Sequence, residues 1–263
     1  MNLGLTGKAA LVAASSRGLG KAIALQLARE GCRVALCART EGPLLEAQKD
    51  IEKETGARVM ARTADVTDGE SVRGLVGSVL AAFGAIDVLV CNAGGPPSGL
   101  PESFAPRDYR EALELNLLST VQLCLAVIPS MKQRSWGRIV NVTSVSAKQP
   151  IGTLILSNTS RAGVHGFSKT LANRLAPFGI TVNCVCPGYT RTERVEALAK
   201  AHEAGGKGTA KDFFEAVERS IPMGRLGRPA ELAAAVAFLA SEPAGYITGV
   251  SLQVDGGYIQ STY

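Results

Sequence analysis

Short apolar segments alternate with longer segments of helical periodicity along the whole chain. Seven of the short segments are rich in β-branched and other apolar residues, as strands are. They cover residues 8–14, 33–38, 57–63, 86–94, 137–144, 180–188 and 250–257. Most are continuous apolar runs rather than alternating ones, which is typical of parallel strands that helices cover on both faces.

The segments between the predicted strands have the spacing of amphipathic helices. We expect helices at Gly18 to Glu30, Pro43 to Thr55, Gly69 to Phe83, Arg107 to Arg134, Leu156 to Phe178, and Pro229 to Ser241. The alternation predicts a single-domain, Rossmann-like, doubly wound α/β fold over residues 1–263, with about seven parallel strands. Residues 190–228 interrupt it with a charged, glycine-containing segment of patchy helical character, which we expect to form a flap over a substrate.

Composition and charge exclude several classes of protein. Hydrophobic residues make up 46% of the chain and charged residues 19%, so disorder is not expected. The net charge of +5 suits an anionic ligand, but the basic residues are scattered, so we do not expect nucleic-acid binding. Residues 115–131 are uncharged, yet Asn116, Gln122 and Pro129 favour a buried helix over a membrane span. The amino-terminal segment fits a first strand better than a signal peptide, so we expect a cytoplasmic protein.

The cysteines show no metal-binding or disulfide pattern. All six lie inside apolar segments, and none has metal-ligand spacing to a histidine. They are Cys32, Cys37, Cys91, Cys124, Cys184 and Cys186. We therefore expect small core residues in a reducing compartment, and no metal site.

A glycine-containing turn follows the first predicted strand. Residues 13–20 read Ala-Ala-Ser-Ser-Arg-Gly-Leu-Gly and continue directly into a helix. Glycines permit a tight turn and close backbone approach, and a helix N-terminus offers free N–H groups to a diphosphate. Gly-x-Gly alone is a weak signal, but its place between the first strand and a helix strengthens it.

This stretch resembles the Thr-Gly-x-x-x-Gly-x-Gly motif of the short-chain dehydrogenase/reductase family, with Ala13 and Ala14 in place of the first two residues. Asp65-Val66, Cys91-Asn92-Ala93-Gly94 and Pro187-Gly188-Tyr189-Thr190, followed by residues 221–225 and 254–257, extend the resemblance over essentially the whole chain. The resemblance implies cofactor contacts from Ala14, Ser16, Arg17, Gly18, Leu19, Gly20, Arg39, Asp65, Val66, Asn92, Ala93, Gly94, Arg161, Pro187, Gly188 and Thr190.

The end of the second strand bears on the choice of cofactor. It reads Ala38-Arg39-Thr40, where Rossmann folds that prefer NAD place an acid for the ribose 2′-hydroxyl. Arg39, with Arg17, matches a 2′-phosphate instead, because a guanidinium fits phosphate oxygens as a fork. The alternative is that Arg39 is a solvated loop residue. We expect NADP(H) rather than NAD(H).

The catalytic residues that the family implies are matched only in part. Asn116 matches the family's Asn, and Ser144 matches its Ser, with Ser146 a less favoured substitute. The resemblance places Ser157 and Arg161 where the family has the Tyr and Lys of Tyr-x-x-x-Lys. A seryl hydroxyl is a far poorer acid than a phenol, whereas an arginine keeps the positive charge and the donors. Neither Tyr189, at a position where the family often has an aromatic, nor His165, which we expect in the core, is assigned a role.

Two hypotheses of different classes follow. The first is an NADP(H)-dependent oxidoreductase that interconverts a carbonyl and an alcohol, similar to 3-oxoacyl-(acyl-carrier-protein) reductases but with another proton donor, such as a water held by Asn116, Ser144, Ser157 and Arg161. The second is a catalytically quiet protein that binds a dinucleotide or metabolite as a sensor or partner subunit.

The resemblance also implies partners. A small carbonyl or alcohol substrate is expected, and an acyl carrier protein would meet Lys132, Arg134 and Arg138, although a solvated helix end is the favoured interpretation of these residues. Family members commonly pair through the helices predicted at 107–134 and 156–178, so we expect a homotetramer.

Overall fold

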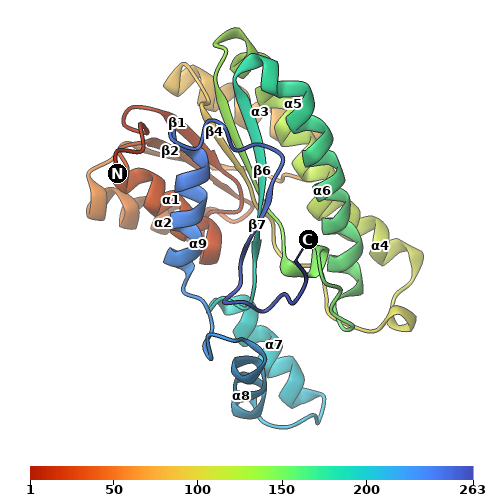
Figure 1. The fold of residues 1–263 in the computed structure, drawn as a ribbon. Helices are drawn as coiled ribbons and strands as arrows, with labels where there is room; N and C mark the ends of the chain where they lie inside the picture. The colour runs from red at the N-terminus through yellow and green to blue at the C-terminus, as the bar shows by residue number, and fades with distance from the viewer. Residues whose placement is uncertain (263) are drawn as a thin grey trace.

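Seven parallel strands form the centre of the structure, a computed structural model that describes residues 1–262 (Figure 1). They are β1 (Ala9–Val12), β2 (Arg33–Ala38), β3 (Val59–Thr63), β4 (Val88–Cys91), β5 (Gly137–Val142), β6 (Ile180–Pro187) and β7 (Ser251–Val254). The order across the sheet is β3-β2-β1-β4-β5-β6-β7. Each of the predicted strands is found, and the doubly wound parallel sheet is confirmed.

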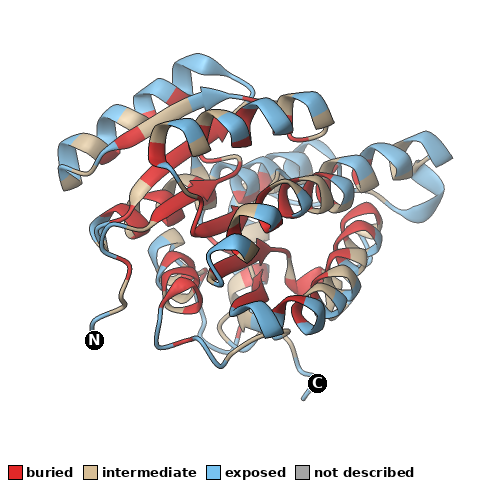
Figure 2. Cartoon of the chain, turned by 90° about the horizontal axis from the view of Figure 1, so that it is seen from above, coloured by how far each residue is buried: buried red, intermediate tan, exposed pale blue. Residues whose placement is uncertain are grey.

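Helices cover both faces of this sheet. One face carries α1 (Gly18–Arg29), α2 (Glu41–Thr55) and α9 (Pro229–Ala240), and the other carries α3 (Gly69–Phe83), α4 (Pro106–Leu113), α5 (Ser119–Gln133) and α6 (Ile155–Leu175). Short 3-10 turns lie at η1 (Pro101–Ser103), η3 (Val145–Ala147) and η4 (Ala176–Phe178). A separate apolar cluster fills the space on each side, and Figure 2 shows the buried residues in the sheet and on the helix faces turned toward it. Burial on both faces is the reason that the strands are continuous apolar runs.

The long helix predicted at 107–134 contains a turn of a different kind. Between α4 and α5 the chain makes a π-helical turn, η2 (Glu114–Leu118), and Asn116 lies in it. The helical stretch Pro106–Gln133 is long and apolar enough to cross a membrane by length and composition, with a mean hydropathy of 1.6 over an 18-residue window. Leu123, Val127 and Met131 nevertheless pack into the core against the sheet, as expected of a buried helix.

The segment at 190–228 is more ordered than its sequence suggests. It forms α7 (Glu193–Ala204) and α8 (Ala210–Ser220), which extend beyond the sheet at the bottom of Figure 1. Val195, Val217, Ile221 and Leu226 form a small apolar cluster of their own, against which Tyr189 and Tyr258 pack. We call residues 190–228 the flap from here on.

The strand order reverses between β1 and β4. Helices leave these neighbouring strands toward opposite faces of the sheet, so a crevice opens beyond their carboxyl ends. In open parallel sheets this is where ligands bind.

Candidate functional site

A cavity of about 650 Å³ lies along the carboxyl ends of the strands, between them and the flap. That volume lies within the range of small-molecule sites. Of the residues predicted for the site, the cavity is lined by Ala14, Ser16, Arg17, Gly18, Leu19, Arg39, Asp65, Val66, Asn92, Ala93, Gly94, Ser144, Ser157, Arg161, Pro187, Gly188 and Thr190. Gly20 and Asn116 are buried behind this lining.

The turn before α1 has the geometry that a diphosphate needs. Ala14 has φ 47° and Gly18 has φ 57°, so both lie in the left-handed region. A Cβ on Gly20 would stand 2.2 Å from the carbonyl oxygen of Ala14, which makes glycine necessary for the helix to pack so close to the turn. Arg17 at the N-cap position makes no side-chain hydrogen bond to the helix, so the first N–H groups of α1 are left for a ligand. The residues present therefore fit a dinucleotide here.

The far end of the cavity holds two exposed arginines, Arg17 and Arg39. Arg17 Nη1 lies 2.7 Å from Glu193 Oε2, so an ion pair joins the turn to the first residue of α7. Asp65, also at this end, accepts hydrogen bonds from the Thr67 N–H at 3.0 Å and hydroxyl at 2.7 Å. These bonds hold the pKa of Asp65 below its usual value.

At the opposite end, three serines form a chain of hydrogen bonds. Ser144 Oγ accepts from the Ser146 N–H at 3.1 Å, and Ser146 Oγ lies 3.1 Å from Ser157 Oγ. Ser144 and Ser157 line the cavity, whereas Ser146 is 1% exposed and lies behind them. Of the two candidates at the end of β5, Ser144 is therefore the one that faces a ligand.

Asn116 supports the site from behind. Its Nδ2 donates to Gly94 O at 3.0 Å, and its Oδ1 accepts from Ser160 Oγ at 3.1 Å. The π-helical turn brings the side chain to this position, between α6 and the loop after β4. Because both ends of the amide are bound to protein groups, Asn116 fixes the loop rather than lining the cavity.

Arg161 ties together the ends of two strands. Its Nη1 donates to Val142 O and Thr143 O, both at 3.0 Å, and its Nη2 donates to Ala93 O at 3.3 Å and to Gly94 O at 3.5 Å. The side chain is 7% exposed. Burial, with a contribution from the nearby charge of Arg194, lowers the pKa of Arg161 to about 10, so it remains a cation at neutral pH.

Arg194 is a site residue that sequence reasoning missed. It stands on α7, lines the cavity, and donates from Nη2 to Pro96 O at 2.6 Å. Its guanidinium packs against Gly95, and a Cβ on that glycine would lie 3.2 Å from Arg194 Nε. An arginine early in a charged flap carries no signal in the sequence that distinguishes it from a solvated residue.

Tyr189 and His165, to which the sequence assigned no role, are held by packing and hydrogen bonds. Tyr189 lines the cavity, but its ring packs edge-on against Tyr258 at 5.6 Å, and burial raises its pKa to about 12. His165 Nε2 lies 2.9 Å from Thr143 Oγ1 and 3.5 Å from Cys186 Sγ. Burial is the main reason that the pKa of His165 falls to about 4, so the imidazole is neutral at pH 7.

All six cysteines are buried, as the sequence predicts, and all are free thiols.

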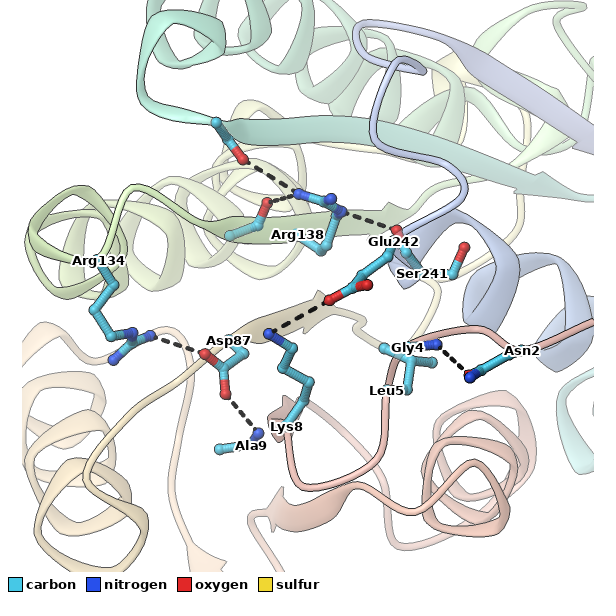
Figure 3. A network of polar contacts seen from close by, with 12 residues as sticks. Asn2, Gly4, Leu5, Lys8, Ala9, Asp87, Arg134, Arg138, Ser241 and Glu242 are labelled. Carbon is cyan, nitrogen blue, oxygen red and sulfur yellow. Dashed lines mark hydrogen bonds and ion pairs between the residues drawn. The ribbon is translucent and has the colours of Figure 1, made fainter.

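One basic residue of the carrier-protein hypothesis does not lie at the surface. Arg138 was wrongly considered as a surface contact: it is 4% exposed and donates to the carbonyl oxygens of Gly137, Gly179 and Ser241 (Figure 3). A basic residue at the start of a strand looks solvated in sequence, but here three chain segments surround it.

Comparison with known proteins identifies relatives over almost the whole chain. A family model described as enoyl-(acyl carrier protein) reductase matches residues 13–259. The 3-oxoacyl-(acyl-carrier-protein) reductase of Haemophilus influenzae is 38% identical over 255 residues, covering 96% of this chain and 98% of that protein.

Solved structures are similar over their full length. The L-sorbose reductase of Gluconobacter frateurii, complexed with NADPH and L-sorbose, superposes with a TM-score of 0.94 at 34% identity, covering 99% of this chain and 100% of that one. An NAD⁺-bound xylitol dehydrogenase superposes with a TM-score of 0.88 at 31% identity, covering 96% of this chain and 99% of that one. With a phosphate turn, a cavity at the carboxyl ends of the strands and relatives of this kind, the chain belongs to the short-chain dehydrogenase/reductase family.

Proposed function

We propose that this protein is an NADP(H)-dependent oxidoreductase that interconverts a carbonyl and an alcohol on a small substrate. The observation that carries the proposal is the single cavity that joins the phosphate turn at one end to Ser144 and Ser157 at the other. A bound dinucleotide would supply the hydride, and the cavity would place it against a small substrate at the serine-containing end.

The two ends of the cavity would bind different parts of the dinucleotide. The α1 N-terminus at Gly18 to Gly20 receives the diphosphate, and Arg17 and Arg39 receive the 2′-phosphate, which favours NADP(H). Asp65 and Val66 lie at the adenine end, and Asn92, Ala93 and Gly94 follow β4. Pro187, the last residue of β6, and Gly188 and Thr190 after it would lie at the nicotinamide end.

The proton step differs from that of the family. Ser157 and Arg161 take the places of the family's Tyr and Lys, and Ser144 is the hydroxyl that orients the substrate carbonyl. A water held between Ser144 and Ser157 donates the proton to the forming alkoxide, and the hydroxide that remains takes a proton from bulk solvent. Arg161 acts on this water through its charge and by holding the ends of β4 and β5, because four of its donors already bind carbonyl oxygens.

The test is a titration with NADPH followed by turnover assays. We expect NADPH fluorescence to saturate, NADPH to bind more tightly than NADH, and a panel of ketones and 3-oxoacyl thioesters to include a substrate. Ser144→Ala is expected to lower kcat by about 10²-fold or more with little change in the Kd for NADPH. The double variant Ser157→Tyr with Arg161→Lys is expected to raise kcat, because it supplies a phenol acid.

One observation favours the second function, a catalytically quiet dinucleotide- or metabolite-binding protein. Ser157 is buried and already shares a hydrogen bond with Ser146, and Arg161 is engaged with backbone carbonyls. Saturable NADPH binding, with no oxidation by any carbonyl and no change in Ser144→Ala, would establish this function and remove the first.

We also propose that the chain assembles as a homotetramer. Leu118 and Leu125 on the helical stretch that ends with α5, and Phe178 after α6, are large apolar side chains that the single chain leaves exposed. Such side chains are typical of interfaces. Sedimentation velocity should give four times the monomer mass, and Leu125→Glu should lower it. We further propose an acyl carrier protein as the carrier of the substrate. The test compares kcat/KM for a 3-oxoacyl group on the carrier protein with kcat/KM for its small thioester.

A further inference from the structure

We propose that Arg194 and Arg161 form an anion subsite that selects substrates with a carboxylate close to the reacting carbonyl. The inference rests on the proposed function, because it names the class of substrate for the same cavity. Arg194 is the direct ligand of the carboxylate, and Arg161 adds positive charge from behind.

Both arginines line the cavity, and their guanidinium groups bind one short piece of chain. Arg161 binds the carbonyl oxygens of Ala93 and Gly94, and Arg194 binds that of Pro96. Gly95, between them, has no side chain, and this absence lets the Arg194 guanidinium lie against the backbone. Two cations thus reach the same four-residue segment after β4, one from α6 and one from the flap.

Neither cation is neutralised by the protein. Within residues 1–262, no carboxylate forms an ion pair with Arg161 or Arg194. The two acids that line the cavity are occupied elsewhere: Glu193 pairs with Arg17, and Asp65 binds Thr67. Two like charges at one end of a cavity repel each other, and an anion between them removes that repulsion. Burial lowers the pKa of both arginines, and at Arg161 the nearby charge of Arg194 lowers it further.

The two arginines differ in what they can offer a ligand. Arg161 is buried and directs both of its terminal nitrogens at carbonyl oxygens. Arg194 is an exposed residue that also lines the cavity. It uses one N–H to bind Pro96 O, while a guanidinium has five such donors. The remaining donors of Arg194 match the two oxygens of a carboxylate.

The position of Arg194 favours a substrate over the phosphates of the cofactor. The loop that it touches is joined to the segment ahead of Ser157, since Gly99 N donates to Thr153 O at 2.8 Å and Gly99 pairs with Leu154. Ile151 and Leu154 of that segment line the cavity with Ser157, so Arg194 meets the apolar, serine-containing end. The diphosphate and the 2′-phosphate have their own donors at the α1 N-terminus and at Arg17 and Arg39.

The experiment compares keto acids with their methyl esters, which differ in charge but hardly in shape. The probes are 2-oxobutanoate, 3-oxobutanoate and phenylpyruvate, each with its methyl ester, titrated calorimetrically into the protein with and without NADP⁺. The proteins are the unmodified chain, Arg194→Met, Arg194→Lys, and Arg191→Met as a matched control, because Arg191 is an exposed arginine of the same segment that does not line this cavity. NADPH oxidation is followed in parallel.

We expect at least one acid to bind about tenfold or more tightly than its ester, as charge-assisted hydrogen bonds allow. Arg194→Met should reduce this preference to about twofold or less, Arg194→Lys should keep part of it, and Arg191→Met should keep it all. The Kd for NADP⁺ should not change in any of them. The inference is overturned if no acid binds better than its ester, if Arg194→Met keeps the preference, or if Arg194→Met weakens NADP⁺ binding by the same factor.

The two proposals fail separately. An acid preference that depends on Arg194, without any NADPH oxidation, would leave the subsite standing and remove the reductase. Reduction of esters and acids at equal kcat/KM would do the reverse.

Discussion

The two edges of the sheet hold buried charge in opposite ways. At the amino edge, where the strands begin, Arg134 Nη2 lies 3.2 Å from Asp87 Oδ1, and Asp87 Oδ2 accepts from the Ala9 N–H at 2.8 Å (Figure 3). Lys8 there lies 4.0 Å from Glu242. At the carboxyl edge, where the strands end, Arg161 and Arg194 line a cavity, and within residues 1–262 neither forms an ion pair with an acid. At the amino edge the charged side chains form ion pairs with one another. At the carboxyl edge the charges of Arg161 and Arg194 are not paired and, in our proposal, bind a ligand.

Arg138 and Arg161 show this difference at single residues. Both are almost fully buried, at 4% and 7% exposure, and both bind backbone carbonyl oxygens. Burial lowers the pKa of both, but the charge of Glu242 opposes this at Arg138, whereas the charge of Arg194 adds to it at Arg161. Arg138 therefore holds chain segments together at the amino edge. Arg161 also binds backbone, but in addition it gives the cavity at the carboxyl edge a positive charge.

Replacing each of these arginines by methionine should give the largest contrast. Arg138→Met leaves three buried carbonyl oxygens without their donor and should lower the free energy of unfolding by about 3 kcal/mol. Arg161→Met also loses hydrogen bonds but removes a repulsion with Arg194, so a loss of about 1–2 kcal/mol is expected. Urea unfolding at pH 7 measures both. An equal or larger loss in Arg161→Met would contradict the claim that the carboxyl edge is electrostatically unsatisfied.

Substitutions at Gly20 and Gly137 should separate an effect on cofactor binding from an effect on core packing. A Cβ on Gly20 would meet the backbone carbonyl oxygen of Ala14 at 2.2 Å, whereas a Cβ on Gly137 would meet the side chain of Met131, from Sδ at 2.5 Å to Cβ at 3.0 Å. Gly20→Ala should therefore distort the phosphate turn and weaken NADPH binding about tenfold or more. Gly137→Ala should lower stability by about 1 kcal/mol and leave NADPH binding unchanged. Fluorescence titration and thermal unfolding of both variants test this, and unaltered NADPH binding by Gly20→Ala would show that the turn does not receive the cofactor.

The sequence specifies the framework of the site better than its charges. Continuous apolar runs identify the strands, and a parallel sheet then brings the ends of β1, β4, β5 and β6 together, so residues as distant as Gly18 and Ser144 can be placed at one cavity. The flap helices could also have been found in part, because Thr209 and Asp212 form a capping box at the start of α8. Glycines 205, 206 and 208, which seemed to interrupt helices, lie between them.

Long-range contacts set the features that the sequence did not predict. Arg138 is buried because carbonyl oxygens from residues 137, 179 and 241 converge on it, and no local pattern records that. Arg194 reaches Pro96 across 98 positions of sequence. The π-helical turn at Asn116 depends on one extra residue in a helical turn, for which there is no residue signature.

The pH dependence of stability should also come from the carboxyl edge. His165 packs beside Thr143 and Cys186, and burial, with the charges of Lys148 and Arg161, lowers its pKa to about 4. Between about pH 6.5 and pH 4 the unfolded chain binds a proton that the folded chain does not, so stability falls as the pH falls. His165→Gln should remove about 1 kcal/mol of the difference in unfolding free energy between pH 7 and pH 5, a value discounted for partial exposure. If both proteins lose the same free energy over this range, the histidine is not the group that titrates.

The smallest effects should come from a backbone feature that both edges share. Within residues 1–262, the non-glycine residues with positive φ are Ala14, at 47° after β1, and Ser135, at 49° before β5. Left-handed backbone costs an L-residue about 1–2 kcal/mol, and a glycine gives back part of this in unfolded-state entropy, so Ala14→Gly and Ser135→Gly should each stabilise the fold by about 0.5 kcal/mol. Only Ala14→Gly should also tighten NADPH binding, since its Cβ borders the cavity while Ser135 lies at the amino edge. Matched thermal shifts with NADPH at several concentrations separate the two contributions, and tighter binding by Ser135→Gly would show that strain at one edge is felt at the other.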